Sequence, residues 1–401
     1  MKIGYFVESY KRGGVDTFIR NLLSQKRHND IFYLIYNNDN PGINYVKKNC
    51  KNIIYLKYSI FAWDQIFDKK INNYFLIILK IIYSLLFPIT FSYQILRLLS
   101  FFKKHDLDKL MIVNGGYPGG DICLAACIAW SQLNPVKKPW INFHNFALKK
   151  YKNFILNIYK DLIDKFILRS AKGFVSVSKI CSSSIKLRKN LKNSKVLTIY
   201  NGHFLKKNKN RFSYKKKFNL PTNSKILLML AEYDLRKGHK FIIDVMEEIN
   251  KKDKNIFLFI FGHGDSYEIN KLVQKSSSSI NIFLNEFNEN NFGLISSCDL
   301  LVIPSQKYES FGYTAIEAMS LKKPVISTNC GGLREVIKNN ITGYLVDRNK
   351  PKLFAKKILN LLSNTKLKKK MGNKSLYRYK KHFTHTKMIK SYNNLMKYNR
   401  I

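Results

Sequence analysis

The stretch Pro304–Met319 reads P-S-Q-K-Y-E-S-F-G-Y-T-A-I-E-A-M and follows the mostly apolar run Asp299–Ile303. An apolar run that stops at Pro-Ser is typical of a buried parallel strand in an α/β protein. The pattern then predicts a loop ending in Ser310-Phe311-Gly312 and a helix over Thr314–Met319, capped by Ser310 or Thr314. A strand, a glycine-containing loop and a helix N-terminus direct N–H groups and a positive dipole end at a ligand, so this site suits a diphosphate.

Two carboxylates of this stretch, Glu309 and Glu317, lie eight positions apart, one in the loop and one in the helix. They can flank a ligand from two sides and accept hydrogen bonds from hydroxyl groups, such as those of a ribose or a sugar ring. The plain alternative is an ordinary helix start that carries two solvated glutamates.

The full string, with S-F-G inside E-x7-E and Pro-Ser before it, resembles the signature of the retaining GT4-type glycosyltransferases, the glycosyl transferases group 1. The resemblance is specific over about Leu227–Asp347 and looser over residues 1–202. It implies an α/β protein of GT-B fold, in which two Rossmann-like, doubly wound parallel-sheet domains face a central cleft. It also implies that Glu309 is catalytic and that the donor-binding residues include Ser310, Phe311, Gly312 and Glu317.

The length of 401 residues allows two domains of ordinary size, and strands that alternate with helices favour parallel sheets. We expect an N-terminal acceptor-binding domain over residues 1–202, which a C-terminal helix over residues 382–401 joins. A nucleotide-sugar-binding domain is expected over residues 203–381. The run Lys206–Lys217 is rich in lysine and lacks apolar periodicity, so we interpret it as the linker between the domains.

A glycine pair in the first domain predicts a ligand-binding loop. The strand Lys2–Glu8 is followed by a turn with Gly13 and Gly14 and then by a helix over Asp16–Leu23. Such a loop lies at the carboxyl edge of a parallel sheet, where ligands bind. In the family a Gly-Gly loop here faces the donor diphosphate and the acceptor, so the resemblance assigns Gly13 and Gly14 to donor binding. Asp16 stands where the family usually has Glu.

A histidine in the first domain also lies at a predicted strand end. The glycine-dense loop Asn114–Gly120 follows one strand, and the next strand, Pro139–Phe143, ends in His144-Asn145. A lone histidine is usually a surface or core residue, but this one lies beside two glycine loops where a ligand is expected. In the family an H-D, H-G or H-N pair at this point contacts the donor sugar, so the resemblance places His144 in the catalytic site.

Two cations of the second domain, Arg236 and Lys237, come between a strand and a helix, where they can neutralise a pyrophosphate. A solvated charged loop is the alternative. Lys237-Gly238 matches the K-G of the family, and the resemblance assigns Lys237 to catalysis and donor binding. The G-R of the family is replaced by Ala231-Glu232, and our hypothesis is that Arg236 supplies the missing charge. Downstream, Cys330–Glu335 resembles a family loop whose backbone amides meet the donor.

An apolar segment over Ile71–Phe102 is very rich in Ile, Leu, Phe and Tyr. It is long enough to cross a bilayer, but Lys80, Pro88 and Arg97 interrupt it. We expect Pro88 to split it into two shorter helices. A helical pair that lies in the membrane interface is the favoured interpretation, and a buried core helix and a true membrane span are the alternatives.

The balance of charge also bears on partners, because Lys and Arg number 70 against 26 Asp and Glu, a net charge of +44. Such an excess indicates nucleic acid, an anionic membrane surface or anionic substrates. The sequence shows neither paired zinc ligands nor an RNP string, so we expect an anionic membrane surface and no nucleic acid. The abundance of Lys, Asn, Ile and Tyr also fits an AT-rich genome.

The cysteines and the N-terminus indicate the compartment. Six scattered cysteines without zinc spacing predict free buried thiols in a reducing compartment. The N-terminal residues M-K-I-G-Y-F-V-E-S-Y lack the apolar core and cleavage site of a signal peptide. We therefore expect a cytoplasmic protein, peripheral on the inner face of the cytoplasmic membrane.

The resemblance implies a hexosyltransferase that retains the anomeric configuration by front-face attack and needs neither a cofactor nor a metal. Asp106-Leu107-Asp108, the only D-x-D of the sequence, is interpreted as a helix end rather than a metal site. The implied donor is a nucleotide-diphosphate-sugar, a UDP-sugar above all, and the implied acceptor is a glycan or lipid-linked. The setting would be bacterial surface polysaccharide or lipopolysaccharide biosynthesis.

Three alternatives remain open at this point. A nucleotide-sugar epimerase or a phosphorylase of the same fold is disfavoured by the full E-x7-E string. Glu232 at the usual arginine position keeps open a second alternative, a non-catalytic GT-B subunit that binds a partner glycosyltransferase or the membrane. A nucleic-acid-binding protein is favoured by the charge alone.

Overall fold

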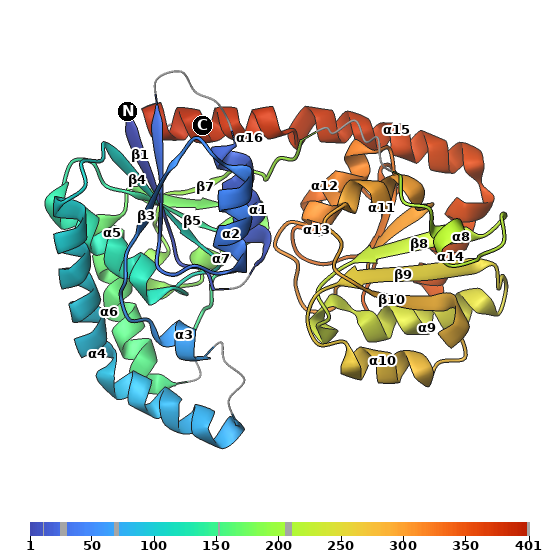
Figure 1. Ribbon diagram of the computed structural model, residues 1–401, viewed down its shortest axis with the longest axis horizontal. Coiled ribbons are helices and arrows are strands. Elements are labelled where there is room, and N and C mark those ends of the chain that lie inside the picture. The colour runs from blue at the N-terminus through green and yellow to red at the C-terminus, as the bar shows by residue number, and fades with distance from the viewer. Residues whose placement is uncertain (11, 25–29, 68–71, 151–152, 205–210, 399–401) are drawn as a thin grey trace. The chain divides into compact units, whose positions relative to one another are not determined.

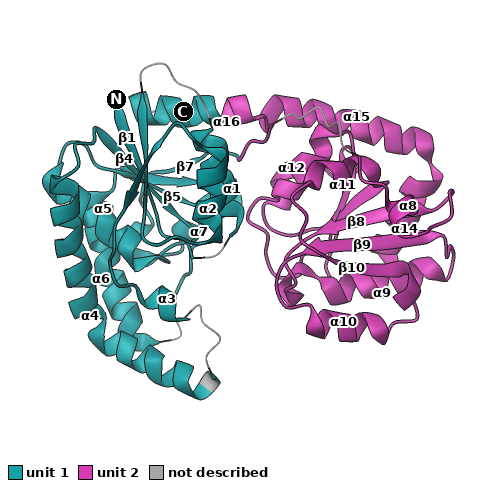
Figure 2. Ribbon diagram, in the orientation of Figure 1, with its two compact units in different colours: residues 1–200, 389–401 teal, residues 201–388 magenta. Residues whose placement is uncertain are grey.

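The computed structural model describes residues 1–10, 12–24, 30–67, 72–150, 153–204 and 211–398 (Figure 1). The chain divides into two compact units, one of residues 1–200 with 389–401 and one of residues 201–388 (Figure 2). Each unit is built on one parallel β-sheet with helices between successive strands. The predicted α/β class with two Rossmann-like sheets is therefore confirmed.

The sheet of the first unit has seven strands in the order β3-β2-β1-β4-β5-β6-β7. Its strands are β1 (Lys2–Val7), β2 (Ile31–Tyr36), β3 (Ile54–Lys57), β4 (Lys109–Asn114), β5 (Trp140–Phe143), β6 (Gly173–Ser176) and β7 (Val196–Thr198). Its helices are α1 (Gly14–Leu23), α2 (Pro41–Asn49), α3 (Trp63–Phe67), α4 (Asn73–Lys103), α5 (Asp121–Leu133), α6 (Phe154–Ser170), α7 (Lys179–Ile185) and the 3-10 turn η1 (Lys189–Leu191). The strand order changes direction between β1 and β4. The loops that leave these two strands therefore diverge, as they do at the ligand site of doubly wound sheets.

The sheet of the second unit has six strands in the order β10-β9-β8-β11-β12-β13, with the change of direction between β8 and β11. Its strands are β8 (Lys225–Leu230), β9 (Ile256–Gly262), β10 (Ile282–Glu286), β11 (Leu300–Ile303), β12 (Val325–Thr328) and β13 (Gly343–Val346). Its helices are α8 (Tyr214–Lys217), η2 (Leu235–Lys237), α9 (His239–Asn250), α10 (Tyr267–Gln274), η3 (Ser279–Asn281), α11 (Asn291–Ser297), α12 (Tyr313–Ser320), α13 (Leu333–Val336), α14 (Pro351–Ser363) and α15 (Thr365–His382).

The central strands of both sheets are buried along their whole length, as in β5, β11 and β12. Parallel strands are covered on both faces, which explains why they appear in the sequence as apolar runs without alternation. The last helix, α16 (His385–Tyr398), begins in the second unit, and its residues from 389 on belong to the first. Within the first unit it contributes the buried Tyr392, whose hydroxyl accepts a hydrogen bond from Asn142 Nδ2 at 2.8 Å.

The apolar segment forms one continuous helix, α4, of 31 residues with Pro88 inside it, so the predicted split into two helices is wrong (Figure 1). A proline costs a helix one backbone hydrogen bond. Packing of α4 against α5, with Leu98 buried, holds the helix together across this interruption.

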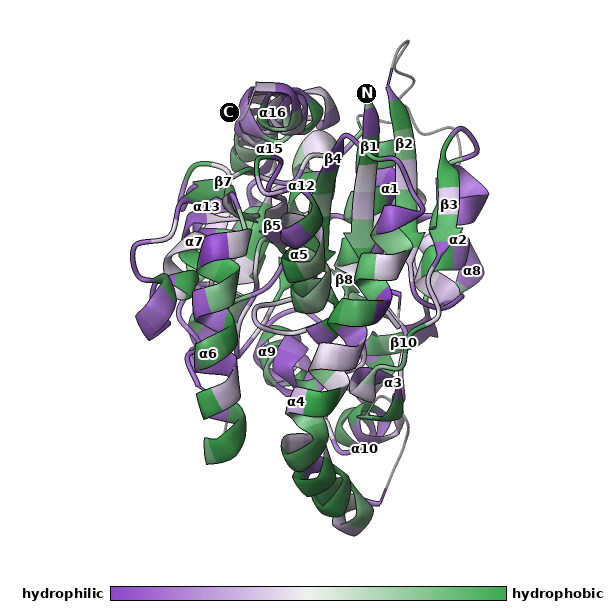
Figure 3. Cartoon of the chain, turned by 90° about the vertical axis from the view of Figure 1, so that its left-hand side faces the viewer, coloured by the Kyte–Doolittle hydropathy of each residue, from purple (hydrophilic) through white to green (hydrophobic). Residues whose placement is uncertain are grey.

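Much of α4 has no protein cover. Over its most apolar 18-residue window only 22% of the helix is buried, and among the described residues α4 is the helix that is long and apolar enough to cross a membrane by length and composition. Figure 3 shows hydrophobic residues around most of its length. The alternative of a buried core helix is therefore wrong for its N-terminal part, where Tyr74 and Phe75 are 76% and 65% exposed.

The predicted linker Lys206–Lys217 differs from the structure in its second part. Residues 206–210 lie outside the described residues. After them Tyr214, in α8, is buried, with its ring centroid 4.7 Å from that of Phe259 and its hydroxyl bonded to the carbonyl oxygen of Leu294 at 3.1 Å. These residues belong to the packed second unit, and their interpretation as linker is wrong. The aromatic side chains between the lysines pack against the second unit, and the run of lysines gave no sign of this.

Candidate active site

Lys237 lies at the carboxyl edge of the second unit's sheet, in the loop that leaves β8. It ends the 3-10 turn η2, and Gly238 follows with a φ of +87°. A Cβ at Gly238 would lie 1.9 Å from the carbonyl oxygen of Pro304, at the end of β11. Only glycine accommodates both this φ and this approach. Gly238 therefore fixes the β8 loop against the β11 loop at the point where the strand order changes direction.

Lys237 and Glu309 form the ion pair of this site. Lys237 Nζ lies 3.1 Å from Glu309 Oε2, and Ser305 Oγ lies 3.4 Å from the same oxygen. The side chains of Lys237 and Glu309 are 28% and 19% exposed, so both reach the surface. The Glu309 carboxylate is the main cause that raises the pKa of Lys237 above its usual value, so the ammonium stays charged. The pair can bind a phosphate with one member and sugar hydroxyls with the other.

The loop Cys330-Gly331-Gly332 packs against the backbone of Glu309. Gly331 has a φ of +52°, and a Cβ there would lie 2.0 Å from the carbonyl oxygen of Glu309. The amide of Gly332 donates to the same oxygen at 2.7 Å, and a Cβ at Gly332 would lie 2.2 Å from the carbonyl oxygen of Ser310. The resemblance implied that amides of this loop meet the donor, but the Gly332 amide is used to hold the backbone of Glu309.

The start of α12 differs from the expected cap. Gly312, with a φ of +97°, is the N-cap residue, so the prediction of Ser310 or Thr314 at this position is wrong. A Cβ at Gly312 would lie 2.6 Å from Leu333 Cδ2, and only glycine combines the left-handed backbone with this close contact. Phe311 is 2% exposed and stacks edge-on against Phe383 at 5.8 Å, so its side chain anchors the loop.

Glu317 lies within α12 and is 6% exposed, in contrast to Glu309 at the surface. The two carboxylates thus have different surroundings, although both belong to the E-x7-E string. A role for Glu317 at the ribose hydroxyls stays a prediction, and it requires that a ligand reach the buried side of this helix.

Arg236 lies beside Lys237 but is held by its own loop. Its Nε and Nη2 lie 2.8 and 2.6 Å from Asp234 Oδ2, and its Nη1 donates to the hydroxyl of Tyr308. The hydrogen bond that Arg236 donates to the Asp234 carboxylate is the main cause that raises the pKa of Arg236. Glu232, at the usual arginine position of the family, lies 3.8 Å from His263 Nε2. The hypothesis that Arg236 replaces that arginine therefore requires Asp234 to share it with the ligand.

In the first unit, Gly13 ends the loop after β1 as the N-cap residue of α1, and Gly14 is the first residue of that helix. No described atom lies within 4 Å of an ideal Cβ at either glycine, so the described residues leave space beside both. Asp16 fixes the loop, because its Oδ2 accepts a hydrogen bond from the Gly13 amide at 2.8 Å. Burial raises the pKa of the Asp16 carboxyl to about 6, and Gly42 packs against it, 2.5 Å from an ideal Cβ to the carboxylate. Asp16 thus fixes the conformation of the backbone at Gly13.

His144 follows β5 in the same unit. Its ring centroid lies 4.3 Å from that of Phe18 on α1, and burial lowers the pKa of the imidazole to about 3. Its Nε2 is buried and has no hydrogen-bond partner among the residues that the structure describes. His144 and the Gly13-Gly14 loop therefore contact the same helix, and His144 is a neutral hydrogen-bonding group.

Glu8 is a buried acid that the sequence analysis did not single out. It follows β1 directly and is 8% exposed, and Tyr10 donates to its Oε1 at 2.5 Å. Burial, followed by the charge of Asp64, raises the pKa of the Glu8 carboxyl to about 8. The available signal was its place as the first charged residue after an apolar strand, at the edge where ligands bind.

The other chemical groups of the chain can be placed more briefly. All six cysteines are buried and free, as predicted. Within the described ranges no group of three or more His, Cys, Asp or Glu side chains is arranged to hold a metal ion. In the D-x-D, Asp106 pairs with Lys2 Nζ at 2.7 Å, and Asp108 accepts a hydrogen bond from the Lys2 amide at 2.8 Å. Both carboxylates therefore bind the first residue of β1.

Comparison with known families and structures agrees with this geometry. The family model for glycosyl transferases group 1 matches residues 210–376, which lie within the second unit, and the resemblance is thereby confirmed. The solved structures with the same fold include a glycosyltransferase from Rickettsia africae (TM-score 0.76, 19% identity, 99% of this chain and 97% of that one). HepE of Anabaena, solved with UDP and glucose, has a TM-score of 0.73 at 14% identity over 99% of this chain and 100% of that one. The fold is therefore GT-B.

Three relatives are similar to parts of the chain. An uncharacterised glycosyltransferase of Methanocaldococcus jannaschii is 29% identical over 52% of this chain and 54% of its own length. Phosphatidyl-myo-inositol mannosyltransferase of Mycobacterium tuberculosis is 25% identical over 40% and 44%. A capsular polysaccharide biosynthesis glycosyltransferase of Staphylococcus aureus is 22% identical over 73% and 77%. The chain spans about half the length of the first two of these relatives.

Proposed function

We propose that the chain is a retaining, metal-independent glycosyltransferase that moves a hexosyl group from a nucleotide-diphosphate-sugar to a glycan or lipid-linked acceptor. The observation that carries the proposal is the Lys237–Glu309 pair, 3.1 Å apart where the strand order of the second unit changes direction. Ligands of doubly wound sheets bind at this point, and the pair offers one group for phosphate and one for hydroxyls.

In the proposed reaction Lys237 binds the diphosphate, and Glu309 accepts hydrogen bonds from the donor sugar. As the glycosidic bond breaks, its electron pair stays on the diphosphate oxygen, where negative charge grows. A fixed ammonium and the N-terminus of α12 lower the barrier because they act most strongly on this charge. The roles of Gly13, Gly14 and His144 toward donor and acceptor, and of Glu317 toward the ribose, are part of the same proposal.

The choice of substrates rests on the relatives. HepE has been solved with UDP and glucose, which supports a UDP-sugar as donor. The relatives that act on phosphatidyl-myo-inositol and in capsular polysaccharide biosynthesis support a lipid-linked or glycan acceptor. We therefore propose a place in the biosynthesis of a bacterial surface polysaccharide, lipopolysaccharide included.

An exposed apolar surface supports a membrane partner. Leu85, Ile89 and Leu96 on α4 are 61%, 68% and 64% exposed, and Phe154 and Phe166 on α6 are 77% and 54% exposed. We call these two helices' exposed apolar residues the α4–α6 surface. Apolar surface of this extent on a monomer marks an interaction site, and a net charge of +44 favours anionic lipids. We propose that the protein is cytoplasmic and peripheral on the inner face of the membrane, with the α4–α6 surface in the interface.

The test is release of free nucleoside diphosphate from a panel of nucleotide-sugars, with and without EDTA. Slow hydrolysis of one donor is expected for the wild type and for Glu268→Ala, a matched change of an exposed glutamate on α10. Glu309→Ala and Lys237→Ala are expected to lose it. Activity that disappears with EDTA would contradict the metal-independent mechanism, and activity that survives in Glu309→Ala would contradict the assigned site.

One alternative keeps a specific observation in its favour, namely a non-catalytic GT-B subunit that binds a partner glycosyltransferase or the membrane. Glu232 replaces the usual arginine, and Arg236 is paired with Asp234. Both features lower the positive charge that a diphosphate would meet. Absence of binding to every nucleotide-sugar in the panel would favour this alternative.

A further inference from the structure

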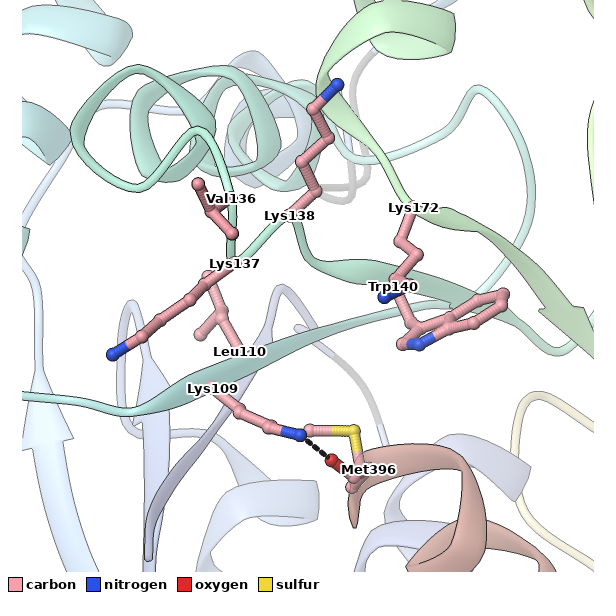
Figure 4. Close-up of a pocket in the computed structure, with 8 residues that line it drawn as sticks. All are labelled: Lys109, Leu110, Val136, Lys137, Lys138, Trp140, Lys172 and Met396. Carbon is pink, nitrogen blue, oxygen red and sulfur yellow. Dashed lines mark hydrogen bonds between the residues drawn. The ribbon is translucent and has the colours of Figure 1, made fainter. Parts of the chain in front are cut away.

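A basic cavity lies in the first unit at the amino edge of its sheet, opposite to the edge where the loops of Gly13-Gly14 and His144 lie. Its volume is about 170 Å³, and it is lined by residues from the starts of β4 and β5, from the loops before β5 and β6, and from α16 (Figure 4). Four of its eight lining residues are lysines: Lys109, Lys137, Lys138 and Lys172.

Figure 4 shows the Lys172 ammonium beside the Trp140 ring and the Lys109 ammonium directed toward Met396, whereas Lys138 points away. Lys109 Nζ is held at the end of α16, where it donates to the carbonyl oxygens of Met396 and, at 3.2 Å, Lys397. An ammonium has three N–H donors, so one remains for a ligand. Burial lowers the pKa of Lys109, and the charge of Lys172 lowers it further, which places these two ammonium groups in each other's field.

A buried polar atom faces the same space. Trp140 is 2% exposed, and its Nε1 has no hydrogen-bond partner within the described part of the chain. The ring cannot easily turn to find one, because Gly173 packs on it so closely that a Cβ there would lie 2.8 Å from Trp140 Cζ3. An indole N–H is only a donor, so the group it lacks is an acceptor. A buried donor without a partner destabilises the fold, and a bound acceptor would remove this penalty.

The acids at this edge are already engaged elsewhere. Asp106 is paired with Lys2 Nζ at 2.7 Å, and Asp108 accepts the Lys2 amide at 2.8 Å. Asp108 is the acid that acts on Lys109, against the two lysines Lys172 and Lys137. Lys195 adds a further cation, with its Nζ 5.5 Å from the centroid of the Trp140 ring. The positive charge around the cavity therefore exceeds the negative charge.

We propose that this cavity binds a phosphate group, held by the ammonium groups of Lys109 and Lys172 and by the indole N–H of Trp140. A phosphate presents several strong acceptor oxygens to these converging donors and neutralises two like charges that are otherwise close together. Free phosphate and the phosphate of an anionic lipid share this chemistry. The site lies outside the sugar-transfer site proposed above, so it would be a separate anion site of the first unit.

The test measures binding of inorganic phosphate to the full chain by calorimetry at low ionic strength, in a Lys237→Ala background that removes the phosphate group's other expected site. We expect saturable binding of one phosphate. Lys172→Met keeps the aliphatic stem and removes the charge, and it is expected to weaken binding at least about tenfold, since a hydrogen bond to a charged group contributes about 1.5–3 kcal/mol. Trp140→Phe keeps the ring and loses the N–H, and several-fold weaker binding is expected.

The matched control is the pair Lys369→Ala with Lys370→Ala, two exposed lysines of α15 whose removal lowers the net charge by more than Lys172→Met does. A second arm measures binding to vesicles of phosphatidylglycerol and of phosphatidylcholine. Lys172-dependent binding to phosphatidylglycerol with no binding of free phosphate would support the proposal with a lipid as the source. The proposal is overturned if Lys172→Met and the control pair behave alike in both arms, because the positive charge would then act without a site.

Discussion

At the scale of single residues, the candidate site depends on glycines whose missing side chains allow backbone contacts. Gly331→Ala introduces a Cβ 2.0 Å from the carbonyl oxygen of Glu309 at a φ of +52°. We expect the free energy of unfolding to fall by about 2 kcal/mol and donor hydrolysis to be lost, because Glu309 must shift. Urea denaturation checks the stability, and nucleotide release checks the activity.

Gly13→Ala is the stability control for that substitution. Its Cβ meets no described atom within 4 Å, and its φ of −162° is extended backbone that alanine adopts. We expect its urea midpoint to equal that of the wild type. Equal midpoints for Gly331→Ala and the wild type would show that the loop behind Glu309 yields easily, against the packing described here.

Glu8 allows a prediction about stability and pH. The pKa of its carboxyl is raised from 4.5 in a free residue to about 8 in the folded chain. Between these values the folded state keeps a proton that the unfolded state has lost, so stability falls as pH rises through this window, by at most about 1.4 kcal/mol per pH unit. Glu8→Gln removes this loss. The variant is expected to gain on the wild type in thermal melts as pH rises from about 5 to about 8.

A constant difference between Glu8→Gln and the wild type across that pH range would contradict the raised pKa of Glu8. Glu268→Gln, at an exposed position of α10, is the matched control and is expected to give parallel curves.

His144 gives a prediction about activity and pH. Because burial lowers the pKa of its imidazole to about 3, the ring is neutral throughout the range of about pH 5 to 8. We expect His144→Asn to lower the rate of sugar transfer while the shape of the pH–rate profile stays the same. A limb near pH 6.5 in the wild type that disappears in His144→Asn would show instead that His144 titrates during the reaction.

At the scale of secondary-structure elements, α4 stands out because its sequence is strongly apolar although much of its surface is exposed. Its N-terminal part exposes large apolar side chains, whereas its C-terminal part buries the side chains of Leu98 and Phe102. The C-terminal part thus has one buried face, with Leu96 exposed on another face, whereas most of the N-terminal part has little protein cover. This division suits a helix that anchors in the first unit and rests on a bilayer interface.

The corresponding variant carries Leu85→Glu with Ile89→Glu, two exposed positions of α4. We expect binding to anionic vesicles to fall by at least about tenfold, because two apolar side chains are lost and two negative charges face anionic lipid. Hydrolysis of the donor in solution is expected to stay unchanged, since neither position contacts the residues of the candidate site. Vesicle sedimentation measures the binding.

Leu353→Glu, at a 39% exposed position of α14, is the matched control for a single charge at an exposed leucine. Equal loss of vesicle binding in this control and in the α4 variant would assign the effect to charge alone and remove α4 from the interface.

The elements also show how far sequence patterns reach. Apolar runs predicted the strands of both sheets, because buried parallel strands have few polar positions. The E-x7-E string located Glu309 and the α12 start, and the K-G pair located Lys237. Helix continuity at Pro88 and the cap at Gly312 could not be predicted, since both depend on contacts with residues distant in sequence, namely α5 and Leu333.

The burial of Glu317 and Glu8 could not be predicted for the same reason. A carboxyl is expected at the surface unless its surroundings are known, and the sequence does not show which faces of α12 and of the β1 end are covered. The pairing of Arg236 with Asp234 was equally hidden, although the two residues are only two positions apart, because the 3-10 turn that brings them together depends on Gly238.

At the scale of the whole molecule, charge and apolar surface contribute separately to the proposed membrane contact, and salt distinguishes them. A net charge of +44 acts through solution over about 10 Å at 0.1 M salt and about 3 Å at 1 M. Burial of apolar side chains does not weaken with salt in this way. We therefore expect binding to phosphatidylglycerol vesicles to weaken as NaCl rises from about 0.1 M to about 1 M and to level off above zero.

The same titration with the Leu85→Glu and Ile89→Glu variant is expected to reach zero, because only the electrostatic part remains. Duplex DNA serves as the comparison, since its binding to a basic protein falls steadily with the logarithm of salt concentration and has no apolar part. If wild-type binding to vesicles also vanished at high salt, the excess of lysine would account for all of it. The α4–α6 surface would then need a protein partner rather than a bilayer to cover its apolar side chains.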